Sequence, residues 1–423
     1  MRHLIIGAGP AGVIAAEHLR ETDPQAGILL IGDEPEPPYS RMALPYYLTG
    51  NIDERGTHLR KSADHFDRLG IELRTGTRVT AIEPADKHVR LEDGREEAYD
   101  RLLLATGSSP ATPPIPGIEQ EGVTPCWTLE QGRAIASGAR PDSPVVLLGA
   151  GFIGSIVLEA LARRGVELHV VEMGDRMVPR MMNETAGGLL KEWCEKKGVK
   201  VHVSTRATAI QSGRNGHRLA VELEGGEVLD ADLVITATGV RPNTGLLEGS
   251  GVQVDQGILI DRNMQTSVEG IYAAGDVAQG RDFSTGEYSV QAIQPTAAEH
   301  GRLAALNMAG RNVPHQGTLN MNVLDTLGLI SSSFGLWQGV EGGDHAELLN
   351  RPRYRYVNLQ FEEDRLVGGT CLGLTEHIGV LHGLIQSRLP LGVWKERLMQ
   401  DPTRLMEAYL ACTQSLSACK VLH

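Results

Sequence analysis

Residues 3–34 read HLIIGAGPAGVIAAEHLRETDPQAGILLIGDE and form one strand–turn–helix–strand pattern. An apolar strand leads into glycines spaced G-x-G-x-x-G, a helical run follows, and a second apolar strand ends in two acids. Such glycines permit a tight turn, close approach of the backbone to a pyrophosphate and close helix packing, and the acid accepts hydrogen bonds from a ribose. With its full context, the pattern predicts a dinucleotide site rather than an unrelated glycine-rich turn. The residues predicted to line this site are Gly7, Gly9, Pro10, Ala11, Gly12, Asp33 and Glu34, with Glu34 preferred over Asp33 for the ribose.

The composition is that of an ordinary globular protein. Its 423 residues predict two or three domains, and 41% of them are hydrophobic and 22% charged. A net charge of -13 argues against a nucleic-acid partner or an anionic membrane surface, and no apolar run reaches the roughly 18 residues that span a bilayer. The five cysteines show no metal-binding spacing, so no metal is expected. Because the glycine pattern begins almost at Met1, a cleaved signal peptide is not expected, and we predict a cytoplasmic protein.

The opening pattern returns in the middle of the chain. Residues 145–176 read VVLLGAGFIGSIVLEALARRGVELHVVEMGDR, again with a strand, three glycines, a helix and a strand that ends in an acid. A strand that ends in Ala-Thr-Gly also occurs twice, at 105–107 and at 237–239. One nucleotide-binding unit therefore occurs twice, which predicts two bound dinucleotides. The residues of the second predicted site are Gly149, Gly151, Ile153, Gly154, Glu172 and Gly239.

Glu172 indicates which nucleotide the second site takes. A carboxylate at this position repels a 2'-phosphate and accepts a hydrogen bond from a 2'-hydroxyl, so NADH is preferred over NADPH. The nearby cation of Arg176 tempers that preference. The alternative is that Glu172 is a solvated residue at the end of a strand and discriminates nothing.

Two later segments extend the first unit. An apolar strand ends in Gly275 and Asp276, and a helix starts at Gln294 with Pro295 in its first turn, where a missing amide is harmless. The N-terminus of that helix could face an electron-rich ring system. Four prolines within 110–116 predict a crossing between domains.

This set of motifs, in this order, resembles the two-dinucleotide-fold flavoproteins of the pyridine nucleotide-disulfide oxidoreductase superfamily over about residues 1–310. The rest is similar to the small C-terminal domain of the rubredoxin reductase and nitrite reductase flavoprotein branch. The resemblance implies an α/β fold with two Rossmann-like dinucleotide-binding domains plus a small α+β C-terminal domain. It implies a discontinuous FAD-binding domain at 1–112 and 241–315, an NAD(H)-binding domain at 113–240, and an interface domain at 316–423 that forms a homodimer.

The resemblance also implies the ligands and their residues. In that family the first unit holds FAD, the second holds NAD(P)H, and hydride passes from the nicotinamide to the flavin. Asp276 is implied at the ribityl chain and phosphate, Val79 on the adenine side, and Gly239 near the nicotinamide. The other residues implied to contact FAD are Thr106, Gly107, Gly275, Gln294 and Thr296.

Thiol chemistry beside the flavin is not expected. The segment RMALPYY places Met42 where disulfide-reducing members carry a redox cysteine, and no cysteine precedes Cys126. A thioether cannot act as a thiolate nucleophile. Cys412 and Cys419 could form a second thiol shuttle, but two helix residues in a reducing compartment are the preferred interpretation.

Arg41 and Met42 are the residues predicted to lie closest to the flavin. Arg41 matches a family loop that runs along the isoalloxazine, where a cation stabilises the reduced flavin; the alternative is that it binds only the FAD pyrophosphate. Ile156 stands where many members carry a glutamate that contacts the nicotinamide amide. It therefore removes a usual nicotinamide contact, unless it is simply a helix position packed in the core.

The motifs leave the electron acceptor open. The first hypothesis is an NADH:acceptor reductase that serves a rubredoxin-like or ferredoxin-like protein, because Arg351, Arg353 and Arg355 recur at period two and would share one face of a strand. A charged run of this kind can also be a solvated face. The second hypothesis is an NADH oxidase that reduces O2 to hydrogen peroxide, or reduces a quinone. The third is a flavin-bearing regulatory or assembly subunit, which the missing carboxylate at Ile156 favours.

Overall fold

The strand that leads into the N-terminal glycine pattern lies at the centre of a five-stranded parallel sheet. In the computed structural model, which describes residues 1–213 and 216–420 and side chains as far as residue 414, β1 (Arg2–Ile6) pairs with β2 (Gly27–Ile31) and with β7 (Arg101–Leu104). The strand order is β19-β7-β1-β2-β3, with β3 (Ile71–Arg74) and β19 (Ile271–Ala273) at the edges. Strand β1 is buried from its second residue to its last, as expected for a parallel strand covered on both faces.

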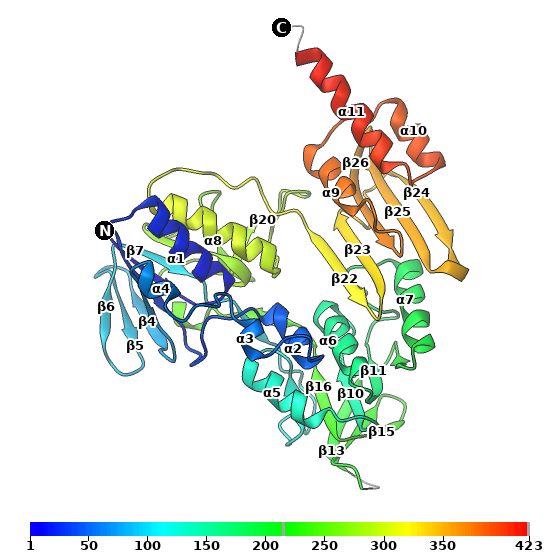
Figure 1. The fold of residues 1–423 in the computed structure, drawn as a ribbon, viewed down its shortest axis with the longest axis horizontal. Coiled ribbons are helices and arrows are strands. Elements are labelled where there is room, and N and C mark those ends of the chain that lie inside the picture. The colour runs from blue at the N-terminus through cyan, green and yellow to red at the C-terminus, as the bar shows by residue number, and fades with distance from the viewer. Residues whose placement is uncertain (214–215, 421–423) are drawn as a thin grey trace. The chain divides into compact units, whose positions relative to one another are not determined.

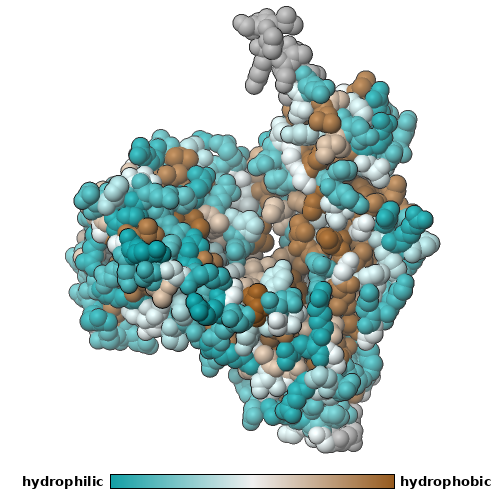
Figure 2. All heavy atoms as spheres, in the orientation of Figure 1, coloured by the Kyte–Doolittle hydropathy of each residue, from teal (hydrophilic) through white to brown (hydrophobic). Residues whose placement is uncertain are grey.

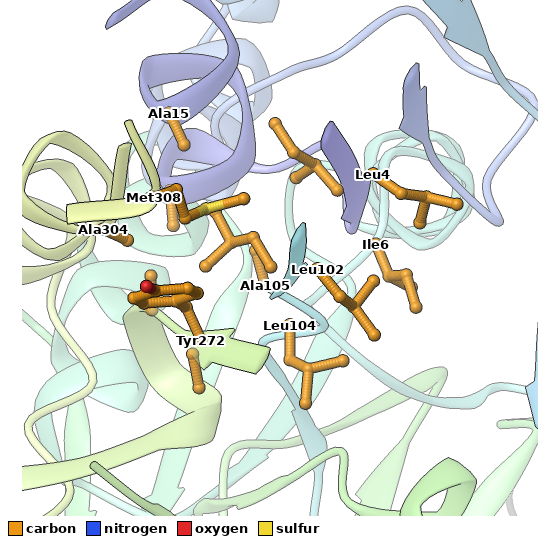
Figure 3. Close-up of a cluster of buried hydrophobic side chains, with 14 of the residues drawn as sticks. Leu4, Ile6, Ala15, Leu102, Leu104, Ala105, Tyr272, Ala304 and Met308 are labelled. Carbon is orange, nitrogen blue, oxygen red and sulfur yellow. The ribbon is translucent and has the colours of Figure 1, made fainter. Parts of the chain in front are cut away.

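Helices α1 (Pro10–Thr22) and α8 (Gln294–Met308) pack closely together beside this sheet (Figure 1). A Cβ atom on Gly301 of α8 would lie 2.3 Å from the carbonyl oxygen of Ala11, so only glycine permits the approach. Side chains from both helices and from the sheet form one core, which Figure 3 shows in close-up. The labelled members of that core are Leu4, Ile6, Ala15, Leu102, Leu104, Ala105, Tyr272, Ala304 and Met308.

Short elements surround the first sheet. Residues 35–70 are mostly loop and contain four short helices: η1 (Arg41–Ala43), α2 (Leu44–Leu48), α3 (Glu54–Thr57) and α4 (His65–Arg68). An antiparallel sheet follows, made of β4 (Val79–Glu83), β5 (His88–Leu91) and β6 (Glu96–Ala98). The remaining small elements are β8 (Ser108–Pro110), β17 (Val240–Pro242), η2 (Gly245–Leu247), β18 (Ile258–Leu259), η3 (Gly275–Val277), β20 (Ala278–Arg281) and β21 (Tyr288–Ser289).

The second glycine pattern builds a second parallel sheet of the same kind. Its order is β12-β11-β10-β16-β9, and β10 (Pro144–Leu148) lies at its centre as β1 does in the first sheet. The predicted repeat of a Rossmann-like unit is therefore confirmed. The other strands are β9 (Val123–Pro125), β11 (Glu167–Val171), β12 (Lys200–His202) and β16 (Leu233–Thr236), with a meander of β13 (Ala207–Ser212), β14 (Leu219–Leu223) and β15 (Val228–Ala231). The helices of this region are α5 (Leu129–Gly138), α6 (Phe152–Arg163) and α7 (Glu184–Lys196).

The C-terminal region is an antiparallel sheet with three helices, as the α+β prediction requires. The strand order is β22-β23-β26-β25-β24. The strands are β22 (Met321–Thr326), β23 (Leu329–Gly335), β24 (Asp344–Asn350), β25 (Arg355–Glu362) and β26 (Arg365–Leu372). The helices are α9 (Ile378–Ser387), α10 (Val393–Gln400) and α11 (Leu405–Lys420).

The predicted arginine face in this region is wrong. Arg351–Arg353 forms a single 3-10 turn, η4, and β25 starts only at Arg355. Pro352 restricts the turn, and Tyr354 has a left-handed backbone with φ of 51°, so the chain reverses between β24 and β25. The three guanidinium groups therefore do not share one face of a strand.

The chain divides into two compact units. Unit 1 comprises Met1–Ala111, Trp127–Leu129 and Val240–Thr318, and unit 2 comprises Thr112–Cys126, Glu130–Gly239 and Leu319–His423. The first boundary lies within the proline cluster. A division into three domains at 112, 240 and 315 stays a prediction. Among the described residues, no helix is both long enough and apolar enough to cross a membrane.

Candidate functional site

The first glycine loop has the geometry of a ligand cradle. Gly7 has φ of 112°, and a Cβ atom there would lie 2.0 Å from the carbonyl oxygen of Ala105. A Cβ atom on Gly12 would lie 1.9 Å from the carbonyl oxygen of Gly7, so helix and strand touch. A Cβ atom on Gly9, in contrast, would meet no described atom within 4 Å. The space beside Gly9 is therefore open to a ligand.

The second loop repeats this geometry in unit 2. Gly149 has φ of 103°, and its Cβ atom would lie 2.5 Å from the carbonyl oxygen of Ala237. The Cβ atom of Gly154 would lie 2.1 Å from the carbonyl oxygen of Gly149. Gly151 has open space, as Gly9 has. Gly239, at the second Ala-Thr-Gly, has φ of 112° and is equally open on its Cβ side.

Both loops lead into helix N-termini that suit an anion. Helices α1 and α6 have Gly9 and Gly151 as N-caps, and within the described chain neither has a side-chain cap or an acid in its first turn. Ile153 lies in the first turn of α6. The free amide groups and the positive end of each helix dipole therefore fit a phosphate group. This is the geometry that a dinucleotide pyrophosphate needs.

Glu34, just after β2, is held by two donors. Its Oε1 accepts a hydrogen bond from Nη2 of Arg41 at 2.7 Å, and its Oε2 accepts from the hydroxyl of Tyr39 at 2.6 Å. Burial raises the pKa of Tyr39 well above its ordinary value, so its hydroxyl stays a donor. Asp33 is exposed. Glu34 is thus the ordered acid of the two, and its role towards a ribose stays a prediction.

Asp276 lies beside the start of α1. A Cβ atom on the preceding Gly275 would lie 3.2 Å from the Cβ of Ala11, which brings these predicted residues together. Oδ2 of Asp276 accepts a hydrogen bond from the hydroxyl of Ser108 at 2.8 Å. Burial raises the pKa of Asp276, whereas the Ser108 hydrogen bond and the charge of Arg41 lower it.

The first Ala-Thr-Gly is hydrogen-bonded to Asn243, a residue that the sequence did not identify as part of the site. The Thr106 hydroxyl donates to the carbonyl oxygen of Asn243 at 2.9 Å, and Nδ2 of Asn243 donates back to the carbonyl oxygen of Thr106 at 2.8 Å. Gly107 has φ of 67° and accepts the backbone N–H of Asn243. The Arg-Pro-Asn that follows the second Ala-Thr-Gly was the available signal.

The remaining residues predicted to lie near FAD are found at three places. The Ser40 hydroxyl donates to Oε1 of Gln294 at the start of α8, where Thr296 is buried. Val79 is buried in the separate sheet of β4, but the backbone of Gly76 and that of Thr77 bind the segment just after β2. Met42 lies in η1 with 41% of its surface exposed.

In the second site, Glu172 is more than a solvated strand end. Its Oε2 accepts the backbone N–H of Ala150 at 2.7 Å, and its Oε1 accepts that of Gly174 at 2.8 Å. Arg176 is directed elsewhere: it pairs with Asp175 at 2.6 Å and donates to the carbonyl oxygens of residues 179 and 182.

The chain is similar to known proteins along most of its length. Residues 1–301 match the family model described as pyridine nucleotide-disulphide oxidoreductase. The chain belongs to this family. It is 32% identical over 405 residues to NADH-dependent phenylglyoxylate dehydrogenase subunit epsilon of Aromatoleum evansii, which covers 95% of each chain. It is 33% identical over 395 residues to NADH oxidase of Methanocaldococcus jannaschii, which covers 88% of each.

Solved structures agree with this assignment. The structure of putidaredoxin reductase in covalent complex with putidaredoxin has a TM-score of 0.88 and 27% identity, and the match covers 97% of this chain and 99% of that one. Pyridine nucleotide-disulphide oxidoreductases use FAD and NAD(P)H. This oxidoreductase is therefore a flavin-dependent enzyme that takes electrons from a reduced nicotinamide nucleotide.

The cysteine side chains that the structure describes are buried. Burial raises the pKa of Cys126, Cys194 and Cys371 to about 12 in each case, so all three stay protonated. Cys412 is also buried, its thiol donates to the carbonyl oxygen of Leu391 at 3.9 Å, and burial raises its pKa. The side chain of Cys419 lies outside the described residues. No group of His, Cys, Asp or Glu side chains among the described residues could hold a metal ion.

Proposed function

We propose that this oxidoreductase transfers electrons from NADH, through FAD held in unit 1, to a small electron-carrier protein of the rubredoxin or ferredoxin type. The observation that carries the proposal is the pair of equivalent glycine cradles, each with an open central glycine and an uncapped helix N-terminus. When bound, FAD accepts hydride from NADH and makes its electrons available to the acceptor. The protein supplies binding, orientation and charge.

The FAD would be held along one side of unit 1. The amide groups at Gly9 and in the first turn of α1 bind the pyrophosphate, and Glu34 accepts from the adenosine ribose. Asp276 accepts from the ribityl chain. The other residues of this proposed site are Gly7, Pro10, Ala11, Gly12, Val79, Thr106, Gly107, Gly275, Gln294 and Thr296.

Arg41 would serve the phosphate end of FAD rather than its ring. Its guanidinium pairs with Glu34, and its charge lowers the pKa of Asp276. A cation that pairs with Glu34 and acts electrostatically on Asp276 serves both the proposed ribose contact and the proposed ribityl contact. Of the two roles considered for Arg41, this geometry favours the pyrophosphate.

NADH is the proposed donor, bound at Gly149, Gly151, Ile153, Gly154, Glu172 and Gly239. The Glu172 carboxylate keeps lone pairs for a ribose diol while it holds the backbone of Ala150. Arg176 is engaged with Asp175 and two carbonyl oxygens, so it offers no free cation for a 2'-phosphate. Both contacts favour NADH over NADPH.

The proposed acceptor follows the relatives. Rubredoxin-NAD(+) reductase of Pseudomonas putida is 30% identical over 390 residues, which covers 91% of this chain and 99% of that one. A second candidate is an NADH oxidase, which the Methanocaldococcus relative and the exposed Met42 favour. A regulatory or assembly role is the third, because one relative is named as a subunit and Ile156 supplies no carboxylate.

We also propose a homodimer formed by the C-terminal strands. Figure 2 shows apolar residues gathered over this region, and Val323, Ile330 and Leu349 are 42%, 39% and 47% exposed. Strand β22 is a sheet edge, so its outer backbone groups can pair with a second chain. Sedimentation at micromolar concentration tests this, and a single monomeric species would rule it out.

Anaerobic stopped-flow spectroscopy tests the main proposal. NADH should bleach the flavin band quickly, reoxidation by oxygen should be slow, and a rubredoxin or ferredoxin should restore the band quickly. Fast reoxidation by oxygen with stoichiometric peroxide would identify an oxidase. A band that neither NADH nor NADPH bleaches would overturn the catalytic proposal in favour of the regulatory one.

A further inference from the structure

The chain returns to unit 1 for three residues, Trp127–Leu129, between two segments of unit 2. This short excursion meets the loop that carries Tyr39 and Arg41. The backbone N–H of Leu129 donates to the Tyr39 hydroxyl at 3.1 Å, and Leu129 packs with Tyr39 and Leu44 in a small apolar cluster. The carbonyl oxygen of Trp127 accepts Nη1 of Arg41 at 2.9 Å.

The indole of Trp127 has two further contacts. The guanidinium carbon of Arg41 lies 5.2 Å from the centre of the indole ring, within the range of a cation–π interaction. The indole Nε1 donates to the carbonyl oxygen of Ser108 at 3.0 Å. The half-buried indole of Trp127 therefore contacts Arg41 through its ring and Ser108 through its N–H.

These contacts form one continuous series between two carboxylates. Glu34 binds Arg41, Arg41 binds Trp127, Trp127 binds Ser108, and the Ser108 hydroxyl binds Asp276. Glu34 and Asp276 are 242 positions apart in the sequence. Trp127 is the central member, and it comes from neither of the segments that carry the two acids.

We propose that Trp127 is a positioning residue for FAD, which acts through Arg41 on the ribose side and through Ser108 on the ribityl side. The proposal rests on the assignment of Glu34 and Asp276 to FAD given above. The indole face restricts the Arg41 guanidinium to one orientation, so the cation is already in place before FAD binds and does not sample other orientations in solvent. The indole N–H fixes Ser108, whose hydroxyl occupies Oδ2 of Asp276 and leaves Oδ1 for a ligand hydroxyl.

The experiment measures release of FAD from the purified holoenzyme, followed by the rise in flavin fluorescence after dilution. Trp127→Ala removes both indole contacts and should speed release about tenfold. Trp127→Phe keeps an aromatic face but loses the N–H, and should speed release about threefold. Trp394→Ala is the matched control, because Trp394 also packs against arginines, Arg397 and Arg404, but belongs to α10 in unit 2.

A double-variant cycle of Trp127→Ala with Arg41→Met distinguishes a positioning role that acts through Arg41 from a general structural role of Trp127. If Trp127 acts through Arg41, the two substitutions together should speed release by clearly less than the product of their separate effects. Release unchanged in both Trp127 variants, or effects that multiply fully, would overturn the proposal. Should Trp127→Ala not fold, Trp127→Phe still tests the Ser108 contact, and unchanged FAD release in Trp127→Phe would then overturn the proposal. A wild-type protein that takes up no FAD would overturn the proposed function as well, whereas FAD uptake with unchanged release overturns only the role of Trp127.

Discussion

The carboxylate of Glu172 accepts the backbone N–H of Ala150 at 2.7 Å, so the acid that follows β11 holds the glycine loop that follows β10. We predict that Glu172→Gln raises the KM for NADH roughly tenfold, because the amide offers one acceptor oxygen to two backbone donors and loses its charge. NADPH use should change less. Steady-state kinetics with both nucleotides checks this, with Glu167→Gln at the far end of β11 as the control. Equal losses for NADH and NADPH would contradict it.

Gly9 and Gly12 should respond differently to the same substitution. Gly12→Ala places a Cβ atom against the carbonyl oxygen of Gly7, so it should destabilise the protein by about 2 kcal/mol. Gly9→Ala meets open space, so the protein should fold normally and lose FAD. Thermal unfolding and flavin content measure the two effects, with Gly27→Ala as a control. Full flavin content in Gly9→Ala would show that the pyrophosphate lies elsewhere.

Two buried histidines should make the protein sensitive to acid. Burial lowers the pKa of His3 from 6.5 to about 4 and that of His300 from 6.5 to about 3. In unfolded chains both rings take up protons below pH 6.5, whereas in the folded chain they stay neutral. Their contribution to stability is therefore complete above pH 6.5 and is lost as the pH falls towards 4, by about 1.4 kcal/mol per pH unit for each histidine.

Urea unfolding at a series of pH values measures this loss. His3 is fully buried, and neither of its ring nitrogens finds a hydrogen-bond partner among the residues described, so His3→Leu should flatten the acid limb. His345→Gln changes an exposed histidine and is the control. An acid limb of unchanged slope in His3→Leu would show that His3 titrates normally.

Ile156 should limit the rate at which NADH reduces the flavin. The side chain is half-buried on α6 rather than packed in the core, so Ile156→Glu should be tolerated. A carboxylate there adds a charged hydrogen bond to the nicotinamide amide, and we expect flavin reduction to be about tenfold faster in stopped-flow experiments. Ile156→Gln introduces a side chain of the same shape as glutamate but without its charge, so it should accelerate flavin reduction less. No change with Ile156→Glu would remove the main support for a regulatory subunit.

Local chemistry made part of this structure predictable. A side chain at Gly12 or Gly154 would collide with the carbonyl oxygen of the first glycine of the same loop, so the spacing of the glycines predicts this close packing. A side chain at Gly7 or Gly149 would collide with the carbonyl oxygen of the alanine in the corresponding Ala-Thr-Gly. The arginine face failed because Pro352 and the left-handed Tyr354 form a turn within an apparently regular run. Asn243 and Trp127 were not predicted, since their partners, Thr106 and Arg41, are far away in sequence.

The three residues Trp127–Leu129, which belong to unit 1 although they lie between two segments of unit 2, limit how unit 1 can be isolated by protein engineering. Fusing residue 111 directly to residue 240 would join the two long pieces of unit 1 and delete residues 112–239, which include the module proposed to bind the nicotinamide nucleotide. The same cut would discard the acceptor for Arg41 and the donor to Tyr39. A minimal flavin-only scaffold would therefore need those three residues grafted back as part of its linker.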